Sequence, residues 1–113
     1  MTTTYIFGPM RKIPYFNFPA FDFAEAYLKT FGYKVLNPAQ ADREHGFDAM
    51  ALPFDYDWSQ IPSDFDFEAT VRRNIDAIFQ SDVLYGLKGW VTSAGARHEF
   101  ALGVMLGKLV MFE

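Results

Sequence analysis

The feature that most constrains the fold of this chain is the alternation of strand-like and helix-like segments along its length. Runs of β-branched and aromatic residues bounded by turn formers indicate strands, and apolar residues three or four positions apart indicate helices. The predicted strands are residues 3–8, 34–38, 82–87 and 108–112. This alternation favours a parallel sheet with right-handed crossovers. We therefore expect an α/β fold, a Rossmann-like or flavodoxin-like open parallel sheet of four to five strands with helices on both faces.

Three helices are predicted between these strands. The first begins near Pro19, which suits a first turn, and ends before Gly32, which suits a C-cap. The second begins at about Asp66, an expected N-cap, and the third begins within the segment GWVTSAGARHEF (89–100). The expected core positions are Phe21, Ala24, Leu28 and Phe31 in the first helix and Val71, Ile75, Ile78 and Phe79 in the second. Residues 39–65 are predicted to form a long acidic and aromatic loop.

The composition predicts one domain, residues 1–113, with a single core. A net charge of −4 without a basic run argues against a nucleic acid polymer as partner, but it is compatible with a single nucleotide. The absence of Cys excludes disulfides and thiolate metal sites, and two His give little material for a metal site, so no metal is predicted. Because the chain has no apolar run of membrane-spanning length and no signal-peptide pattern, we expect a cytoplasmic protein without a membrane partner.

Ligands of open parallel sheets bind beyond the carboxyl ends of the strands, where the strand order reverses. The two loops expected there are GPMRKIPYFNFP after the first strand and KGWVTSAG after the third. Both contain glycine and polar groups, and they hold aromatic rings that suit either the core or stacking on a base. The candidate binding residues in and beside these loops are Gly8, Pro9, Arg11, Phe18, Trp90, Ser93, Gly95 and Ala96.

Glu99 stands out because it lies near the predicted start of the third helix, where its neighbours one helical turn away are all small or apolar. These neighbours are Gly95, Ala96, Leu102 and Gly103. A first-turn glutamate can simply complement the helix dipole. Alternatively, it serves as a nucleophile or a charge-stabilising carboxylate beside a ligand. Ser93 is open to two interpretations as well, as an N-cap or as part of an anion site at the helix start. Arg11 suits either a solvent-exposed position or a phosphate ligand.

Two further polar residues fall among apolar neighbours. Asn74 lies on the apolar stripe of the second predicted helix, where its amide is either satisfied by the protein or in contact with a ligand. Tyr5 alternates with Phe7 in the first strand, and if it is buried its hydroxyl needs a hydrogen-bond partner.

Three segments together, YIFGPMRKIPYFNFPAF, GYKVLNPA and GWVTSAGARHEFALG, resemble the nucleoside 2-deoxyribosyltransferase-like superfamily. The resemblance runs from Thr4 to Phe112 and is closest to a short bacterial and phage branch with YIxGPM and GWxxSxGAxxE motifs. It implies cleavage of an N-glycosidic bond, with Glu99 attacking the anomeric carbon through an oxocarbenium-like transition state. Nucleoside transferases of this superfamily tend to have an aspartate at the position of Ser93, whereas its deoxynucleoside 5′-monophosphate hydrolases have a serine there. Those hydrolases also have an arginine at the position of Arg11 and a tyrosine at the position of Tyr5. The resemblance therefore implies a 5′-monophosphate substrate.

The resemblance thus implies a cofactor-free N-glycosidase that converts a 2′-deoxynucleoside 5′-monophosphate to free base and 2-deoxyribose 5-phosphate. The alternatives are deoxyribosyl transfer between bases and a catalytically weak nucleotide-binding or sensing protein. Asn74 keeps the last alternative open, because the family usually has an aspartate there that protonates the leaving base, and an amide cannot deliver a proton. A water or another acid, such as Asp55 or Asp57, would then supply it. A homodimer or a higher even-numbered assembly is also expected.

Overall fold

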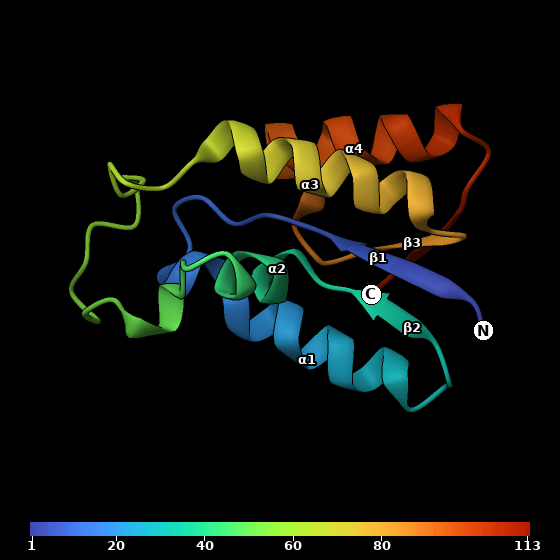
Figure 1. The fold of residues 1–113 in the computed structure, drawn as a ribbon, viewed down its shortest axis with the longest axis horizontal. Coiled ribbons are helices and arrows are strands. Elements are labelled where there is room, and N and C mark those ends of the chain that lie inside the picture. Colours follow the sequence, from blue (N-terminus) through green and yellow to red (C-terminus); the bar gives the residue numbers. More distant parts are fainter.

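A computed structural model, which describes residues 1–113, confirms the predicted α/β fold (Figure 1). Its sheet has four strands, all parallel, in the order β2-β1-β3-β4. The strands are β1 (Thr3–Phe7), β2 (Lys34–Leu36), β3 (Val83–Gly86) and β4 (Leu109–Phe112). Each lies inside a segment predicted as a strand. The order reverses between β1 and β3, so the switch point lies where the two predicted loops leave the sheet.

Four helices cover the sheet, α3 and α4 on one face and α1 and α2 on the other (Figure 1). They are α1 (Phe18–Lys29), α2 (Pro38–Glu44), α3 (Phe67–Gln80) and α4 (Ala94–Met105). Three short 3-10 turns, η1 (Pro14–Asn17), η2 (Ala49–Ala51) and η3 (Trp90–Thr92), lie in the connections. No helix is both long and apolar enough to cross a membrane.

Two apolar clusters fill the two faces of the sheet. One lies on the side of α1 and α2 and includes Ile6, Phe21 and Leu87. The other, between the sheet and the pair α3 and α4, consists of Tyr5, Phe7, Ile78, Leu84 and Ala96. Because side chains alternate along a strand, Ile6 joins the first cluster while Tyr5 and Phe7 join the second. The alternation therefore places the Tyr5 side chain on the same side of the sheet as α4.

The predicted loop 39–65 was wrong at its start, where α2 forms. Asn37 caps this helix by accepting a hydrogen bond from the backbone N–H of Ala39 at 2.9 Å, and Pro38 occupies its first turn. Residues beyond Glu44 are irregular, as predicted, apart from η2. At the start of α3 the prediction is confirmed, since the Asp66 carboxylate accepts from the N–H of Ala69 at 3.0 Å.

The expected core positions were only partly correct. In α1, Phe21, Ala24 and Leu28 are buried, but Phe31 lies beyond the helix end and is 64% exposed. In α3 only Ile78 is buried among the four expected positions, and the exposed fractions of Val71, Ile75 and Phe79 are 36%, 41% and 55%. The inner face of α3 is instead rich in polar residues. Its buried and half-buried positions include Thr70, Arg73, Asn74, Ala77 and Ile78.

Candidate functional site at the switch point

The two predicted loops are neighbours at one edge of the sheet. Phe7 pairs with Gly86 at the ends of β1 and β3, and the N–H of Leu87 donates to the carbonyl of Phe7 at 2.9 Å. Gly8 and Pro9 are buried at this edge. A Cβ on Gly8 would lie 2.8 Å from the Cβ of Leu87, so any side chain at position 8 would clash with Leu87. The prediction that these loops meet is therefore confirmed.

The loop after β1 has an unusual backbone. Lys12, Tyr15, Phe16 and Asn17 all have positive φ, between 48° and 66°. Such conformations cost about 1–3 kcal/mol each and persist only where surrounding contacts enforce them. Here the Asn17 amide donates to the carbonyl of Pro9 at 2.9 Å, and the N–H of Lys12 donates to the carbonyl of Trp58 at 3.0 Å. The switch point therefore carries a strained loop that the protein holds in place, as functional sites often do.

The start of α4 is capped by Ser93, whose hydroxyl accepts from the N–H of Ala96 at 3.2 Å. Ala96 is buried, whereas Gly95 is exposed, and a Cβ on Gly95 would meet only the Ser93 hydroxyl, at 3.9 Å. Ser93 is therefore the N-cap of α4, which is one of the two roles considered for it. The exposed first turn of α4 also presents backbone N–H groups that favour an anion.

Glu99 was expected in the first turn of its helix, but α4 begins at Ala94, so Glu99 lies in the second turn. Tyr5 and Glu99 meet on the α4 side of the sheet, where the Tyr5 hydroxyl donates a hydrogen bond to Oε2 of Glu99. Tyr5 is fully buried and Glu99 is partly buried. Burial raises the pKa of Glu99 from 4.5 to about 7, and the hydrogen bond from Tyr5 opposes this rise. Burial and the adjacent Glu99 charge raise the pKa of Tyr5 well above 10, so its hydroxyl remains a donor. A carboxyl group poised near neutral pH is characteristic of catalytic sites.

A cavity of about 290 Å³ lies next to Tyr5, between α2 and α3 near strand β2. Asn74 lines this cavity together with Arg73, Asn37 and Gln40. Tyr5 is therefore the residue that connects the cavity with Glu99, which does not itself line it. The Arg73 Nε is buried and has no hydrogen-bond acceptor in the protein. A polar donor left in this state is expected where a ligand or water completes the site.

The remaining predicted residues are placed differently. Arg11 is exposed, with its guanidinium 5.1 Å from the ring centre of Phe67, and it forms no ion pair. Trp90 packs on three phenylalanine rings, with its ring centre 4.6 Å from that of Phe100. Phe18 was predicted to contact a ligand, but it is fully buried in the core beneath the guanidinium of Arg43, so its ring does not reach a bound molecule in this conformation.

A second buried carboxyl group, Asp42 on α2, was missed from the sequence. Burial raises its pKa to about 6 despite hydrogen bonds from Arg73 at 3.4 Å and Thr70 at 3.5 Å. Its charge also contributes to the raised pKa of Tyr5. The Asn37-Pro38 pair marks the start of α2 in the sequence, but no local signal marks the burial of Asp42, which depends on Thr70 and Arg73 of α3.

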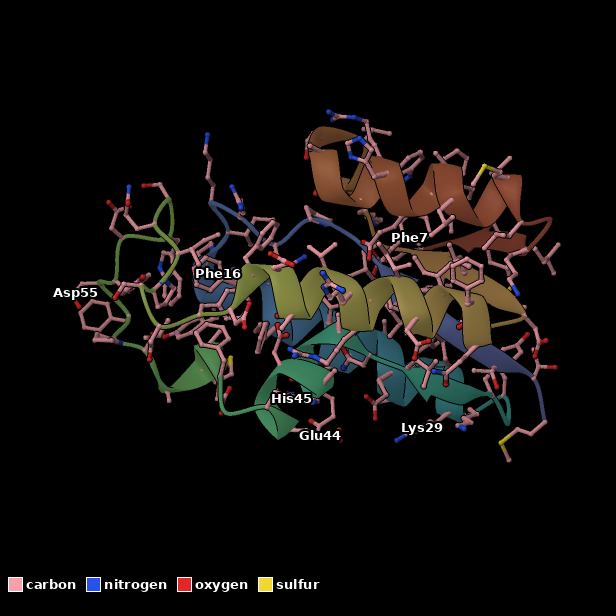
Figure 2. All side chains as sticks on the ribbon, turned by 45° about the horizontal axis from the view of Figure 1, so that its top comes forward. Phe7, Phe16, Lys29, Glu44, His45 and Asp55 are labelled. Carbon is pink, nitrogen blue, oxygen red and sulfur yellow. The ribbon has the colours of Figure 1, made fainter.

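The other two acids considered for proton delivery are poorly placed. Asp55 lies at the far end of the long loop, remote from Phe7 at the switch point (Figure 2). Asp57 is exposed, and hydrogen bonds from Ser59 lower its pKa, which makes it a weaker proton donor. No group of three or more His, Cys, Asp or Glu residues is placed to hold a metal ion.

Comparison with known proteins gives a family for the chain but no activity. No curated protein matches this chain. A family model described as a domain of unknown function, DUF4406, matches residues 2–112. Since the match covers nearly the whole sequence, the chain belongs to the DUF4406 family.

Proposed function

We propose that the protein is an N-glycosidase of the nucleoside 2-deoxyribosyltransferase-like superfamily. Its substrate would be a 2′-deoxynucleoside 5′-monophosphate, and its products free base and 2-deoxyribose 5-phosphate. The observation that carries the proposal is the Tyr5–Glu99 pair, a poised carboxyl group held by a buried hydroxyl at the switch point. Sequence motifs around both residues support the family assignment.

The chemistry assigns a role to each member of the pair. Ionised Glu99 forms a bond to C1′ of the sugar as the C1′–N bond breaks and the base leaves with the bonding electrons and takes up a proton. Water then hydrolyses the glycosyl ester, its oxygen going to C1′ and one proton returning to solvent. The Tyr5 hydroxyl orients the carboxylate before attack. Because the pKa of Glu99 is about 7, the ionised form is well populated at neutral pH.

The phosphate preference is argued from three features of the segments that follow β1 and β3. Ser93 and the exposed first turn of α4 provide hydrogen-bond donors and a positive helix end. Arg11, in the loop on the neighbouring strand, carries a positive charge that no carboxylate in the protein neutralises. An aspartate at position 93 would repel a phosphate, whereas serine does not.

One observation favours a second function, nucleotide binding without efficient turnover. Asn74 lines the cavity beside Tyr5, where an amide can hold a base by hydrogen bonds but cannot protonate it. Asp55 is remote from the switch point, and Asp57 is exposed with a lowered pKa, so neither is placed to replace the missing acid. If the protein is an enzyme, the leaving base would be protonated by water or by Asp42, the other carboxyl group with a raised pKa.

The test is incubation of the protein with each common deoxynucleoside monophosphate and with the matching nucleosides, followed by chromatographic detection of free base. The variant Glu99→Gln removes the nucleophile, and Glu68→Gln, at an exposed position on α3, serves as the matched control. We expect base release from a monophosphate that Glu99→Gln abolishes and Glu68→Gln preserves.

Other results would lead to other conclusions. Base exchange in the presence of an added base would identify a transferase. Saturable nucleotide binding without product would identify a binder or sensor. Base release that survives in Glu99→Gln would refute the proposed mechanism.

A further inference from the structure

Arg73 on α3 has hydrogen-bonding capacity that the chain does not use. Its Nη2 donates to Thr70 at 3.0 Å and to Asp42 at 3.4 Å, and it is the only nitrogen of this guanidinium that donates within the chain. The Nε is buried without an acceptor. Since a guanidinium donates hydrogen bonds and accepts none, the unused nitrogens can bind only a group that offers an acceptor.

The Arg73 side chain reaches the cavity of about 290 Å³ beside Tyr5. It is 26% exposed, so a molecule in the cavity can contact the guanidinium. Asp42 is only 3% exposed and lines a separate, smaller pocket of about 120 Å³, which Arg73 lines as well. Arg73 therefore stands between the buried carboxyl group and the cavity, and Asp42 holds the guanidinium from the side away from a ligand.

The proposed reaction produces a negative charge that some group must stabilise. When the C1′–N bond breaks, both electrons go to the base, which becomes an anion unless it takes up a proton in the same step. Asn74 lines the cavity but its amide cannot donate that proton, and Asp42 does not line the cavity. The remaining means is a fixed positive donor at the place where the charge develops.

We propose that Arg73 is a catalytic residue, which binds the leaving base and stabilises it as an anion. This role rests on the proposed glycosidase function. Glu99 forms the new bond to C1′, and the electron pair of the C1′–N bond moves onto the base. Arg73 stays charged throughout, so it transfers no proton. The water that later hydrolyses the glycosyl ester gives its oxygen to C1′ and supplies the proton that neutralises the base.

This role also selects a class of base. A 2-oxo-pyrimidine leaves through a ring nitrogen next to a carbonyl group, so the released electron pair is delocalised directly onto the carbonyl oxygen. A negatively charged oxygen is a strong acceptor for guanidinium N–H groups. Adenine has no carbonyl group, and its charge stays on ring nitrogens. We therefore expect 2′-deoxyuridine 5′-monophosphate to be a better substrate than 2′-deoxyadenosine 5′-monophosphate.

The first test compares turnover of 2′-deoxyuridine 5′-monophosphate with that of its 5-fluoro analogue, whose base leaves more readily as an anion. Arg73→Lys keeps a positive charge beside Asp42 but loses the planar guanidinium. We expect kcat for the uracil nucleotide to fall by about 10- to 100-fold and kcat for the fluoro analogue to fall several-fold less. A purely structural role would lower both rates equally. Arg72→Lys, at a 78% exposed position on the same helix, is the matched control and should keep both rates.

The second test needs no turnover. Calorimetry measures the affinities of free uracil and 5-fluorouracil at one pH, and the wild type should prefer the more acidic 5-fluorouracil. Because Arg73→Met alone would leave the buried Asp42 without its ion pair, it is combined with Asp42→Asn, which removes that charge. We expect the double variant to lose the preference and to bind 5-fluorouracil about 10-fold more weakly or worse.

The two tests separate this role from the glycosidase activity itself. Turnover that Arg73→Lys leaves unchanged, or lowers equally for both nucleotides, would overturn the role of Arg73 and leave the glycosidase standing. No turnover in the wild type, together with a base affinity that requires Arg73, would refute the glycosidase and retain Arg73 as a base-binding residue. Equal base binding by the wild type and the double variant would refute the role of Arg73 in either case.

Discussion

Replacing Glu99 with glutamine is expected to stabilise the protein, by an amount that depends on pH. Burial raises the pKa of Glu99 from 4.5 to about 7, so the folded chain binds this proton more tightly than the unfolded chain does. Stability therefore falls as pH rises between these values, because unfolding releases the proton and is favoured at low proton concentration. The destabilisation is absent below about 4.5 and complete above about 7. Glutamine is neutral throughout and still offers Tyr5 an oxygen acceptor.

The magnitude follows from the pKa values. A rise from 4.5 to about 7, at about 1.36 kcal/mol per pH unit, corresponds to about 3 kcal/mol in the free energy of unfolding. Glu99 is partly exposed, so solvent screening makes this an upper value. At about pH 8, Glu99→Gln should be more stable than the wild type by up to about 3 kcal/mol, or roughly 10 °C in Tm for a domain of this size. At about pH 4.5 the two proteins should have nearly equal stability.

Urea unfolding of the wild type, Glu99→Gln and the surface control Glu68→Gln, followed across this pH range, measures the effect. The pKa of Asp42, raised to about 6, lies in the same window, but Asp42 is present in all three proteins and cancels in the difference. Glu68→Gln should differ little from the wild type, since its side chain is 77% exposed. A stability difference that stays constant with pH, or a Glu99→Gln protein less stable at about pH 8, would show that Glu99 is not held in an unfavourable charged state.

The phosphate site, Asn74 and the packing of α4 on β3 can each be tested by substitution. Arg11→Ala or Ser93→Asp should weaken monophosphate binding in calorimetry by about 1.5–3 kcal/mol and leave nucleoside binding nearly unchanged; equal losses would mean that the phosphate lies elsewhere. Asn74→Asp should raise the rate of base release by up to about 10²–10⁴-fold if it restores a proton donor, and a lower rate would show that the amide itself recognises the base. Gly103→Ala should lower stability by about 1–3 kcal/mol, because its Cβ would lie 2.5 Å from Cδ2 of Leu84; an unchanged Tm would contradict the close packing of α4 on β3.

The fold was predictable because its signals are local. Each strand is a short apolar run bounded by turn formers, and the caps of α3 and α4, Asp66 and Ser93, were readable from single residues. Helix α2 was missed because its seven residues are too few to show an apolar period, although Asn37 marks its start. Periodicity also identified α3 as a helix but was correct for only one of its four expected core positions, Ile78, because a period reports an apolar face and not what that face contacts.

Sequence analysis singled out Tyr5 and Glu99 separately but did not predict the contact between them. Tyr5 and Glu99 are 94 residues apart in the chain, and only the adjacency of β1 and β3 brings the strand residue to the helix that follows β3. Phe18 was misplaced because an aromatic residue near a binding loop and an aromatic residue in the core have the same sequence signal. Asp42 was missed because its burial depends on contacts with α3, far along the chain.

Helix α3 turns several of its polar residues toward the sheet. Thr70, Arg73 and Asn74 are buried or half-buried, as is the apolar Ile78, whereas Val71, Ile75 and Phe79 are exposed. Burying polar groups is unfavourable unless they are hydrogen-bonded, and the buried Nε of Arg73 has no acceptor in the chain. Under the proposed function, a polar ligand in the cavity that Arg73 and Asn74 line would supply the acceptor that the Arg73 Nε lacks.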